Sequence, residues 1–257
     1  MKNIHPTAIV SKTAIIGKNV LIGPYCIIGD NVEIGDKSVL DSHVVIEGFT
    51  KIGRSNHFFP SSVIGTSGQD LKYKGEPTKL LIGNNNVFRE FVTINSSTTP
   101  EDHTSIGDNC YFMSYSHVAH NCQLSDNIVM ANVATLGGHV IIDDNVIIGG
   151  LTAIHQFVKV GRYAFLGGAS GIKKDVPPYT RGEGMPYKPS GLNSIGLRRK
   201  GFPESVIEKI RHIYKLFYNK GMNVSQALIE ADKISNLTEE QNHFINFIRH
   251  SSRGICK

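Results

Sequence analysis

The sequence predicts an all-β parallel β-helix of hexapeptide repeats over residues 1–185, followed by a small α-helical domain over residues 186–257. Two observations predict this fold class: a six-residue glycine period in the first part of the chain, and a change to helical spacing after Gly191. A period of six matches neither a lone strand nor a helix, whose side chains repeat about every 2 and 3.6 residues. Twelve glycines before residue 170 share one phase of this period, and most of them follow an aliphatic residue: Gly17, Gly23, Gly29, Gly35, Gly53, Gly65, Gly83, Gly107, Gly137, Gly149, Gly161 and Gly167.

Each hexapeptide is expected to form one short flat face and one turn. The aliphatic residue, as in Ile22-Gly23, points inward and stacks on its equivalent in the next coil, while the glycine adopts the unusual backbone angles of the turn. Three faces complete a triangular coil, so residues about 18 apart should lie on top of one another. Because Trp is absent and 40% of the residues are hydrophobic, we expect a core of many small aliphatic side chains.

The repeat is interrupted at two places and then ends. Residues 66–80 are polar, lack the aliphatic pattern, and predict a loop that leaves one corner of the scaffold. A second irregular stretch covers residues 89–105. The period ends near Asp175, where the two prolines of residues 177–178 predict a stiff exit from the last coil.

The last part of the chain has the spacing of helices. Pro203 suits the first turn of a helix, and apolar residues at helical intervals follow it until Gly221. Their apolar stripes are expected to pack as the core of the small domain. Two capping boxes predict the starts of two further helices: Asn223 with Gln226, and Thr238 with Gln241.

Composition narrows the class of protein. The net charge is +5 and the isoelectric point about 8.9, a mild surplus that suits an anionic substrate or an acidic partner better than a nucleic-acid surface. The four cysteines have no CxxC spacing, which argues against a zinc knuckle or a disulfide framework and for a reducing cytosol. No apolar run approaches a membrane span and no N-terminal segment has the pattern of a signal peptide, so we expect a cytoplasmic protein.

Histidines gather in the later coils. His117, His120, His139 and His155 fall within a few coils, and the stack would place them near one another. One interpretation is a metal site, as in β-helical carbonic anhydrases, but the spacing of His117 and His120 is shorter than in that family. The other is general-base catalysis, in which one histidine takes a proton from a hydroxyl while its neighbours hold an anionic substrate.

Longer motifs carry a more specific signal, and they extend from Ile4 to Ile255, over almost the whole chain. They are GQDLKYKGEPT (68–78), REFVTIN (89–95), SHVAHNC (116–122), LGGHV (136–140), GGLTAIHQF (149–157), DVPPY (175–179) and GLRRKGF (196–202). With these motifs the chain closely resembles the UDP-N-acetylglucosamine 3-O-acyltransferase family. The resemblance implies a left-handed β-helix, a homotrimer with active sites between subunits, and an enzyme without a cofactor or metal.

The same resemblance implies an activity, the first step of lipid A synthesis. A 3-hydroxyacyl group moves from the thioester of acyl carrier protein to the 3-hydroxyl of UDP-N-acetylglucosamine. His120 matches the general base, and the backbone N–H of Gly138 matches the group that stabilises the oxyanion. For substrates, the matching positions are His117, His139 and His155 around the base, Asp70 and Lys72 for the acyl donor, Gln156, Asn193 and Arg199 for the nucleotide, and Gly168 for the length of the acyl tail, where glycine implies a long chain.

Two positions depart from the family pattern. Asn121 follows the expected base where many members have an aspartate, and it is expected to make the imidazole of His120 a weaker base. Asn95 stands where many members have a histidine, which is expected to alter a contact to the acceptor. The sequence therefore leaves both the ordinary sugar and its 3-amino variant open as acceptors.

Other classes of protein remain alternatives at this point. A sister hexapeptide transferase shares the repeat, although the N-acyltransferase of the same pathway usually has a large N-terminal domain and here the repeats begin near residue 4. A structural β-helix would show flat Thr-x-Thr arrays and no clustered histidines. For the acidic acyl carrier protein, we expect a basic docking surface near the helical domain that includes Arg198, Lys200, Arg211, Lys215 and Lys220.

Overall fold

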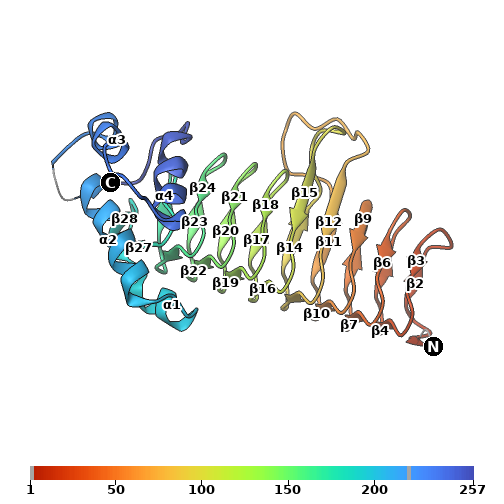
Figure 1. Ribbon diagram of the computed structural model, residues 1–257. Helices are drawn as coiled ribbons and strands as arrows, with labels where there is room; N and C mark the ends of the chain where they lie inside the picture. Colours follow the sequence, from red (N-terminus) through yellow and green to blue (C-terminus); the bar gives the residue numbers. More distant parts are fainter. Residues whose placement is uncertain (1–2, 219–220) are drawn as a thin grey trace.

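The computed structural model describes residues 3–218 and 221–257, and it consists of a triangular β-helix with helices packed at its C-terminal end (Figure 1). The described strands of the β-helix form three sheets, each of which is one face of the prism. Most strands are two residues long, because each face is only as long as one hexapeptide. The predicted parallel β-helix is confirmed.

The three faces are called sheets A, B and C. Sheet A contains eleven of the described strands: β1 (Asn3–Ile4), β4 (Leu21–Ile22), β7 (Val39–Leu40), β10 (His57–Phe58), β13 (Val87–Phe88), β16 (Tyr111–Phe112), β19 (Val129–Met130), β22 (Ile147–Ile148), β25 (Phe165–Leu166), β27 (Thr180–Glu183) and β28 (Lys188–Leu192). Sheet B contains nine of them: β2 (Ile9–Val10), β5 (Ile27–Ile28), β8 (Val45–Ile46), β11 (Val63–Thr66), β14 (Thr93–Asn95), β17 (His117–Val118), β20 (Thr135–Leu136), β23 (Ala153–Ile154) and β26 (Gly171–Ile172). Sheet C contains the other eight: β3 (Ile15–Ile16), β6 (Glu33–Ile34), β9 (Phe49–Ile52), β12 (Lys79–Ile82), β15 (His103–Ile106), β18 (Gln123–Leu124), β21 (Ile141–Ile142) and β24 (Lys159–Val160).

Neighbouring coils pair in parallel, and the spacing of the paired residues follows the predicted period. Ile4 pairs with Ile22, at an interval of 18 residues. The interval grows to 30 residues between Phe58 and Phe88, and to 24 between Phe88 and Phe112. Two coils therefore contain insertions.

Both insertions leave the prism at the corner where sheet B leads to sheet C. One is the loop of residues 67–78 between β11 and β12, and the other is the loop of residues 96–102 between β14 and β15. They are the large orange and yellow excursions in Figure 1. The first matches the loop predicted at residues 66–80. The second is shorter than the irregular stretch predicted at residues 89–105, because β14 and the start of β15 lie within that range.

The interior is largely aliphatic, as predicted. Ile22 and Ile28, which precede in-phase glycines, are 2% and 1% exposed. Three phenylalanine rings lie in the middle coils of the core, where Phe58, Phe88 and Phe112 stack with ring centroids 4.7 and 5.0 Å apart. These rings fill the coils from which the two loops emerge.

The role predicted for the periodic glycines is wrong. Among the twelve, only Gly65 has a positive φ, and the left-handed residue of a turn stands two positions after the glycine, as at Asn19. The glycines are needed because the next coil passes directly against them. A Cβ atom on Gly35 would lie 2.5 Å from the carbonyl carbon of Gly53, far inside van der Waals contact. The period therefore records the close approach of successive coils and not a turn conformation.

The non-glycine residues with a positive φ, here called left-handed residues, belong to different residue types at different corners of the prism. Where sheet C leads to sheet A, most of them are asparagine, which tolerates this conformation: Asn19, Lys37, Ser55, Asn85, Asn109, Asn127, Asn145 and Tyr163. Where sheet A leads to sheet B, most are larger or apolar: Tyr25, His43, Ser61, Phe91, Tyr115, Val133, Leu151 and Ala169. Bulky and β-branched residues are strained in this conformation. Something other than the local backbone therefore favours them at the A–B corner.

The predicted helices after Pro203 are confirmed. Both capping boxes form with their reciprocal hydrogen bonds at Asn223 and Thr238. One additional short helix precedes Pro203. No helix within the described ranges has the length and apolar character needed to cross a membrane. The described helices are α1 (Ser194–Arg199), α2 (Glu204–Tyr218), α3 (Val224–Asp232) and α4 (Glu239–Arg249).

The helical part is tied to the last coil by Asp175, which is fully buried. One of its carboxylate oxygens accepts a hydrogen bond from the backbone N–H of Lys159 at 2.8 Å, and the other accepts from the hydroxyl of Ser251 at 2.7 Å. Before the helices, β27 and β28 form an antiparallel hairpin that extends sheet A. The domain boundary predicted after residue 185 falls inside this hairpin and stays a prediction.

We expect Gly35→Ala to lower the free energy of unfolding by about 1–3 kcal/mol, the usual cost of overpacking. The added methyl group would press on the backbone of the next coil, which cannot move without shifting its own neighbours. Gly29→Ala is the matched control, because a Cβ atom there would meet nothing closer than 3.4 Å. Chemical denaturation of the two variants measures the difference, and equal stability would contradict the close-packing role.

Candidate active site

The predicted histidines gather at the corner where sheet B leads to sheet C. His120 follows β17, His139 follows β20, and His155 follows β23, each in its own coil. The loops of residues 67–78 and 96–102 leave the prism from this same corner. The structure therefore brings the histidines and both insertions together, as the stacking of coils predicts.

His120 lies beneath the first loop and is only 9% exposed. Its imidazole meets that of His139 edge to face, with ring centroids 5.3 Å apart. A Cβ atom on Gly68 would lie 2.9 Å from the Cβ atom of His120 and 2.6 Å from a methyl group of Thr98. Glycine at position 68 lets the loop pass this close to the histidine. Sequence reasoning did not single out Gly68, although a glycine at the start of a polar insertion is the signal that could have found it.

A network of polar groups holds the side chain of Asn121, which is 2% exposed. Its Oδ1 lies 2.8 Å from Nδ1 of His120 and also accepts hydrogen bonds from the N–H and hydroxyl of Thr98, at 3.1 and 3.0 Å. Its Nδ2 donates to the carboxylate of Asp102 at 2.9 Å. Because a carbonyl oxygen faces Nδ1, the imidazole donates there and keeps the lone pair of Nε2 for accepting a proton.

Gly138 lies against the other edge of the His120 imidazole. A Cβ atom on Gly138 would be 2.6 Å from Nε2 of His120 and 2.5 Å from Cε1, so any side chain would close this edge. Its carbonyl accepts a hydrogen bond from the N–H of Phe157 at 3.0 Å, whereas its own N–H donates to no group in residues 3–218 and 221–257. A free N–H beside a base can stabilise the negative oxygen of a reaction intermediate.

His139 stacks on Phe157, with ring centroids 4.6 Å apart. Burial and the neighbouring His120 lower the pKa of His139, although the carboxylates of Asp102 and Asp70 act in the opposite direction. A histidine with a lowered pKa is neutral near pH 7 and acts as a hydrogen-bonding group.

His117 lies on β17, three residues before His120 in the same coil. Its Nδ1 is 2.7 Å from the hydroxyl oxygen of Thr93. Burial lowers the pKa of His117, with His120 as a second cause, while the bond to Thr93 acts in the opposite direction. The corner therefore holds neutral imidazoles around His120, which suits the binding of a polar sugar.

The first loop brings Asp70 toward the histidines and leaves Lys72 exposed. The carboxylate of Asp70 accepts a hydrogen bond from the backbone N–H of Lys72 at 2.9 Å, and its charge acts on His139. The side chain of Leu71, between them, is fully exposed. Both predicted donor-site residues thus lie on the insertion that covers His120.

Asn95 anchors the base of the same loop. Its Nδ2 donates to the hydroxyl of Thr66 and to the carbonyl of Ser67, both at 3.1 Å. Its Oδ1 is buried and has no hydrogen-bond partner among the described residues. In this chain Asn95 holds the loop in place, a role that sequence reasoning did not assign to it.

His155 and Gln156 lie one coil beyond Gly138, at the same corner, and both are exposed. Nδ1 of His155 is 3.4 Å from the guanidinium of Arg253, near the end of the chain. A Cβ atom on Gly137 would lie 2.8 Å from the backbone nitrogen of Gln156. The two residues therefore extend the histidine corner toward the helical part.

Two of the predicted nucleotide contacts lie elsewhere on the chain. Asn193 and Arg199 line a cavity of about 390 Å³ beside sheet A, which also includes Ile147 of β22 and Phe165 of β25. This is a different face of the prism from the B–C corner. Within one chain, the structure does not bring these residues together with His120.

The side chain of Asn193 is used within the fold. Its Oδ1 accepts from the N–H of Gly196 at 3.1 Å and caps α1, and its Nδ2 donates to the carbonyl of Tyr163 at 3.0 Å. Arg199 is exposed in the last turn of α1, and Arg181 of β27 adds a second guanidinium to the cavity wall. Sequence reasoning missed Arg181. Two guanidinium groups suit a diphosphate.

Gly168 lies at the A–B corner, three residues after Phe165 of the cavity wall, and is exposed. A Cβ atom there would lie 3.1 Å from the carbonyl oxygen of Gly150, one coil earlier. Because Gly150 and Gly168 have no side chains, the backbone of two successive coils is uncovered here, next to the left-handed residues Leu151 and Ala169. A large side chain at position 168 would cover part of this backbone.

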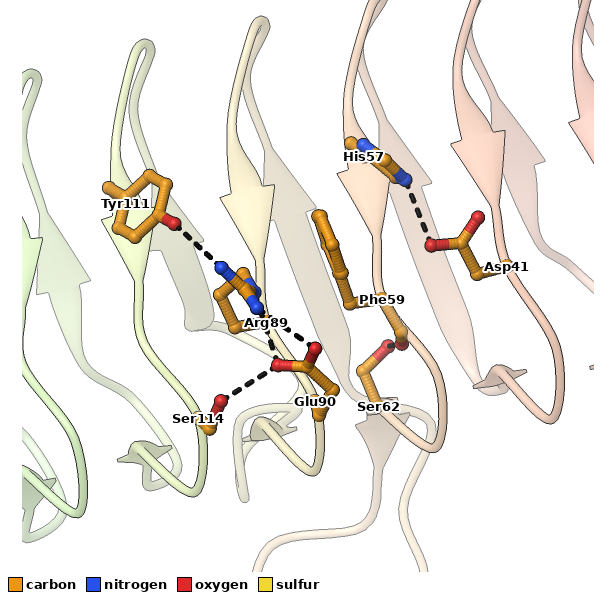
Figure 2. Close-up of polar contacts among 8 residues, drawn as sticks. All are labelled: Asp41, His57, Phe59, Ser62, Arg89, Glu90, Tyr111 and Ser114. Carbon is orange, nitrogen blue, oxygen red and sulfur yellow. Dashed lines mark hydrogen bonds and ion pairs between the residues drawn. The ribbon is translucent and has the colours of Figure 1, made fainter.

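A second polar cluster lies along sheet A and is satisfied internally (Figure 2). Arg89 donates two hydrogen bonds to Glu90 and one to Tyr111, and its guanidinium lies 4.4 Å from the ring centroid of Phe59. Together with a hydrogen bond from Ser114, the bonds from Arg89 lower the pKa of Glu90 to about 2. The cluster ties three coils together near the A–B corner, which is a structural role.

A metal site was the alternative interpretation of the histidines. In the part of the chain that the structure describes, no three His, Cys, Asp or Glu side chains are placed to hold one ion. His120 bonds to Asn121, and His117 bonds to Thr93. This arrangement favours proton transfer as the task of the histidine corner.

The fold and the histidine corner define a class of protein, the bacterial hexapeptide transferases. A family model described as bacterial transferase hexapeptide (six repeats) matches residues 13–48. A second model, described as UDP-N-acetylglucosamine O-acyltransferase, domain 2, matches residues 175–256.

Known proteins identify the family within this class. The acyl-[acyl-carrier-protein]–UDP-N-acetylglucosamine O-acyltransferase of Gloeothece citriformis is 47% identical over 97% of this chain and 90% of its own length. The protein of that name from Thermodesulfovibrio yellowstonii is 47% identical over 100% of both chains. The crystal structure of the UDP-N-acetylglucosamine acyltransferase of Bacteroides fragilis is 40% identical, covers 99% of this chain and 100% of its own, and superimposes with a TM-score of 0.96. The chain belongs to the UDP-N-acetylglucosamine O-acyltransferase family, and its fold is the predicted left-handed parallel β-helix.

We expect His120→Ala to raise the pKa of both His117 and His139 part of the way toward 6.5, their ordinary value. The substitution removes the repulsion between imidazolium groups, while burial of the two neighbours remains. NMR titration of the histidine C–H signals measures both shifts. His243 is the internal control, because burial and Arg162 lower its pKa within the helical part. Unchanged values for His117 and His139 would show that His120 does not act on them.

Proposed function

We propose that this chain transfers a 3-hydroxyacyl group from acyl carrier protein to the 3-hydroxyl of UDP-N-acetylglucosamine, the first step of lipid A biosynthesis, with His120 as general base. One observation carries the proposal: Asn121 fixes Nδ1 of His120, and the opposite edge of the ring lies against Gly138, whose N–H is free among the described residues. Acyl transfer to an alcohol needs this pair, a base for the hydroxyl and a donor for the oxyanion. The activity named for the relatives supports the choice of substrates.

The proposed reaction begins with the sugar hydroxyl, which is a poor nucleophile at neutral pH. Nε2 of His120 takes its proton while the oxygen attacks the thioester carbonyl carbon, so that a C–O bond forms. The N–H of Gly138 stabilises the negative oxygen of the tetrahedral intermediate. When the intermediate collapses, the C–S bond breaks and the imidazolium returns its proton to the departing thiolate. The step balances without a cofactor.

We assign the two substrates to different parts of the surface. Arg199 and Arg181, at the cavity beside sheet A, offer charge pairing to the diphosphate. Asp70 and Lys72, on the loop above His120, hold the acyl donor. Asn193 acts through the position of α1, which it caps. His117, His139, His155 and Gln156 surround the acceptor sugar at the histidine corner.

We further propose a homotrimer in which neighbouring chains complete each site. The base lies at the B–C corner, whereas the arginine cavity lies beside sheet A, so a single chain holds the two parts on different faces. A neighbouring copy can bring its cavity next to this corner. A closed ring satisfies every such contact, as closed symmetry does in most soluble homo-oligomers.

The A–B corner supports this assembly. Five of its left-handed residues are large, apolar or aromatic and exposed: Tyr25, Phe91, Tyr115, Val133 and Leu151. Strained backbone costs roughly 1–3 kcal/mol for each residue and persists where the surroundings require it. Four of them, Phe91, Tyr115, Val133 and Leu151, stand in successive coils, and an exposed apolar edge of this kind is typical of a surface that another protein covers. We identify the occupant as a second copy of the chain.

The acyl carrier protein is assigned to the basic side of the helical part. Lys200 and Lys215 are exposed there, whereas Arg198 and Arg211 form ion pairs with neighbouring glutamates. Lys220 lies outside the described residues. Of the predicted residues that the structure describes, Lys200 and Lys215 are therefore the ones that offer unpaired positive charge to an acidic carrier. All four cysteines are free and buried, which suits the cytoplasmic location that we propose.

Product analysis tests the proposed activity and the role of His120 together. We expect the wild-type protein to place one long 3-hydroxyacyl group on the sugar nucleotide, because Gly168 leaves the backbone there uncovered. We expect His120→Ala to lower the rate by about 10²–10⁴-fold, the range of general-base catalysis. Mass spectrometry with a panel of 3-hydroxyacyl carrier proteins, and with the ordinary and 3-amino sugar nucleotides as acceptors, measures both results.

His212→Ala, an exposed position on α2, is the control for loss of an imidazole. Absence of any acylated sugar nucleotide from wild type would overturn the function, and an active His120→Ala would remove His120 from its role.

For the assembly, we expect Leu151→Asp to weaken the trimer, because it places a charge in the apolar A–B edge. Asn127→Asp is the matched control, since it adds the same charge at a left-handed position of the polar C–A corner. Light scattering at the concentration of the activity assay measures the oligomeric state. A wild-type protein that is fully active as a monomer would contradict the proposal.

A further inference from the structure

We propose that Asp102 is a positioning residue for the general base, supplying through Asn121 the negative charge that Asn121 itself lacks. The proposal rests on the proposed function of His120. It gives a role to a carboxylate on the second insertion, the loop of residues 96–102, which sequence reasoning passed over. The three groups form one line of hydrogen bonds, from Nδ1 of His120 to Oδ1 of Asn121, and from Nδ2 of Asn121 to Oδ2 of Asp102.

The direction of the Asn121 amide decides whether His120 can act as a base. If the NH₂ group faced His120, Nδ1 would have to accept, and the proton would sit on Nε2, where the base must be free. Two neighbours prevent this orientation. The backbone N–H of Thr98 can only donate, so it selects the carbonyl oxygen of the amide. The carboxylate of Asp102 can only accept, so it selects the NH₂ group.

Asp102 is itself held in place on both sides. Its Oδ1 accepts from the N–H of His103 at 2.7 Å, and its Oδ2 accepts from Asn121 at 2.9 Å. Its backbone carbonyl accepts from the hydroxyl of Ser97 at 2.8 Å, which closes the loop. Both carboxylate oxygens are therefore committed to donors. An asparagine at this position has one oxygen for two donors, and its NH₂ group would face one of them.

The negative charge of Asp102 also favours the protonated state of nearby imidazoles. It favours the protonated state at His139, the imidazole next to His120. A negative charge at the end of the chain of hydrogen bonds stabilises the imidazolium that His120 becomes during attack. Because Asp102 does not touch the substrate in the proposed reaction, its effect reaches the reacting atoms through Asn121.

An exchange of the two side chains tests the proposal. Asp102→Asn should lower kcat by about 10- to 100-fold, the usual cost of losing a group that orients a functional side chain, with little change in either KM. The double variant Asn121→Asp with Asp102→Asn should recover most of the lost kcat. In it, the carboxylate introduced at position 121 would accept from His120, from Thr98 and from the NH₂ group introduced at position 102. The amide oxygen at position 102 would accept from the N–H of His103, so that every contact is satisfied again. Glu101→Gln, an exposed position in the same loop, is the control for the loss of charge.

The pH profile separates positioning from loop packing. The acidic limb of kcat/KM should move to lower pH in Asp102→Asn, because the imidazolium has lost a stabilising charge, and should return in the double variant. A wild-type kcat and limb in Asp102→Asn would overturn the proposal. A raised KM with unchanged kcat would also overturn it, as would a double variant no more active than Asp102→Asn.

A measurement that needs no substrate keeps this test apart from that of the function. Nitrogen NMR spectra of the wild-type histidines should show His120 in the neutral form with its proton on Nδ1. A proton on Nε2 would overturn the role of Asp102 whether or not the protein acylates a sugar nucleotide. A wild-type protein with the proton on Nδ1 and no transferase activity would instead overturn the proposed function alone.

Discussion

The stacking of one coil directly on the next places the histidines and Gly138 of the candidate site. The N–H of His139 donates to the carbonyl of His120, and the N–H of Phe157 donates to that of Gly138, each across neighbouring coils at 3.0 Å. At every in-phase glycine except Gly29, a Cβ atom would lie within about 3 Å of a neighbouring segment, so successive coils are closely packed. The histidine corner shares this rigidity, so the proposed base, His120, is positioned by packed coils.

The candidate site lies where two insertions interrupt the regular repeat. The loops of residues 67–78 and 96–102 both leave from the corner of His120. The first covers the imidazole, and Gly68 permits its close approach. The second delivers Thr98 and Asp102 to the amide of Asn121. A uniform prism would present the same histidine in an open corner, without the groups that fix its protonation. The insertions therefore turn a structural repeat into a site.

The sequence predicted the fold and the main residues because both follow from local patterns. Buried aliphatic positions recur every six residues, and the capping boxes specify their helices with near neighbours alone. The reason for the glycines was misassigned, since a period records where glycine is required and not whether φ or packing requires it. Asp102 was missed because it reaches Asn121 along an insertion whose path has no period. Asn193 shows a third limit: a motif match gives the residue type, while its hydrogen bond to the carbonyl of Tyr163 depends on how α1 packs against the last coils.

The proposed division of the site between two faces is consistent with the ranges of the forces involved. Proton transfer needs atoms placed to a fraction of an ångström, and two successive coils of one chain supply that accuracy for His120 and Gly138. Attraction between a guanidinium and a diphosphate falls off slowly with distance and tolerates small shifts. Arg181 and Arg199 can therefore act from another chain across an interface, whereas the base and the oxyanion donor cannot be divided in this way. A rigid prism with chemistry at one corner and charge beside another face is suited to working as a ring of copies.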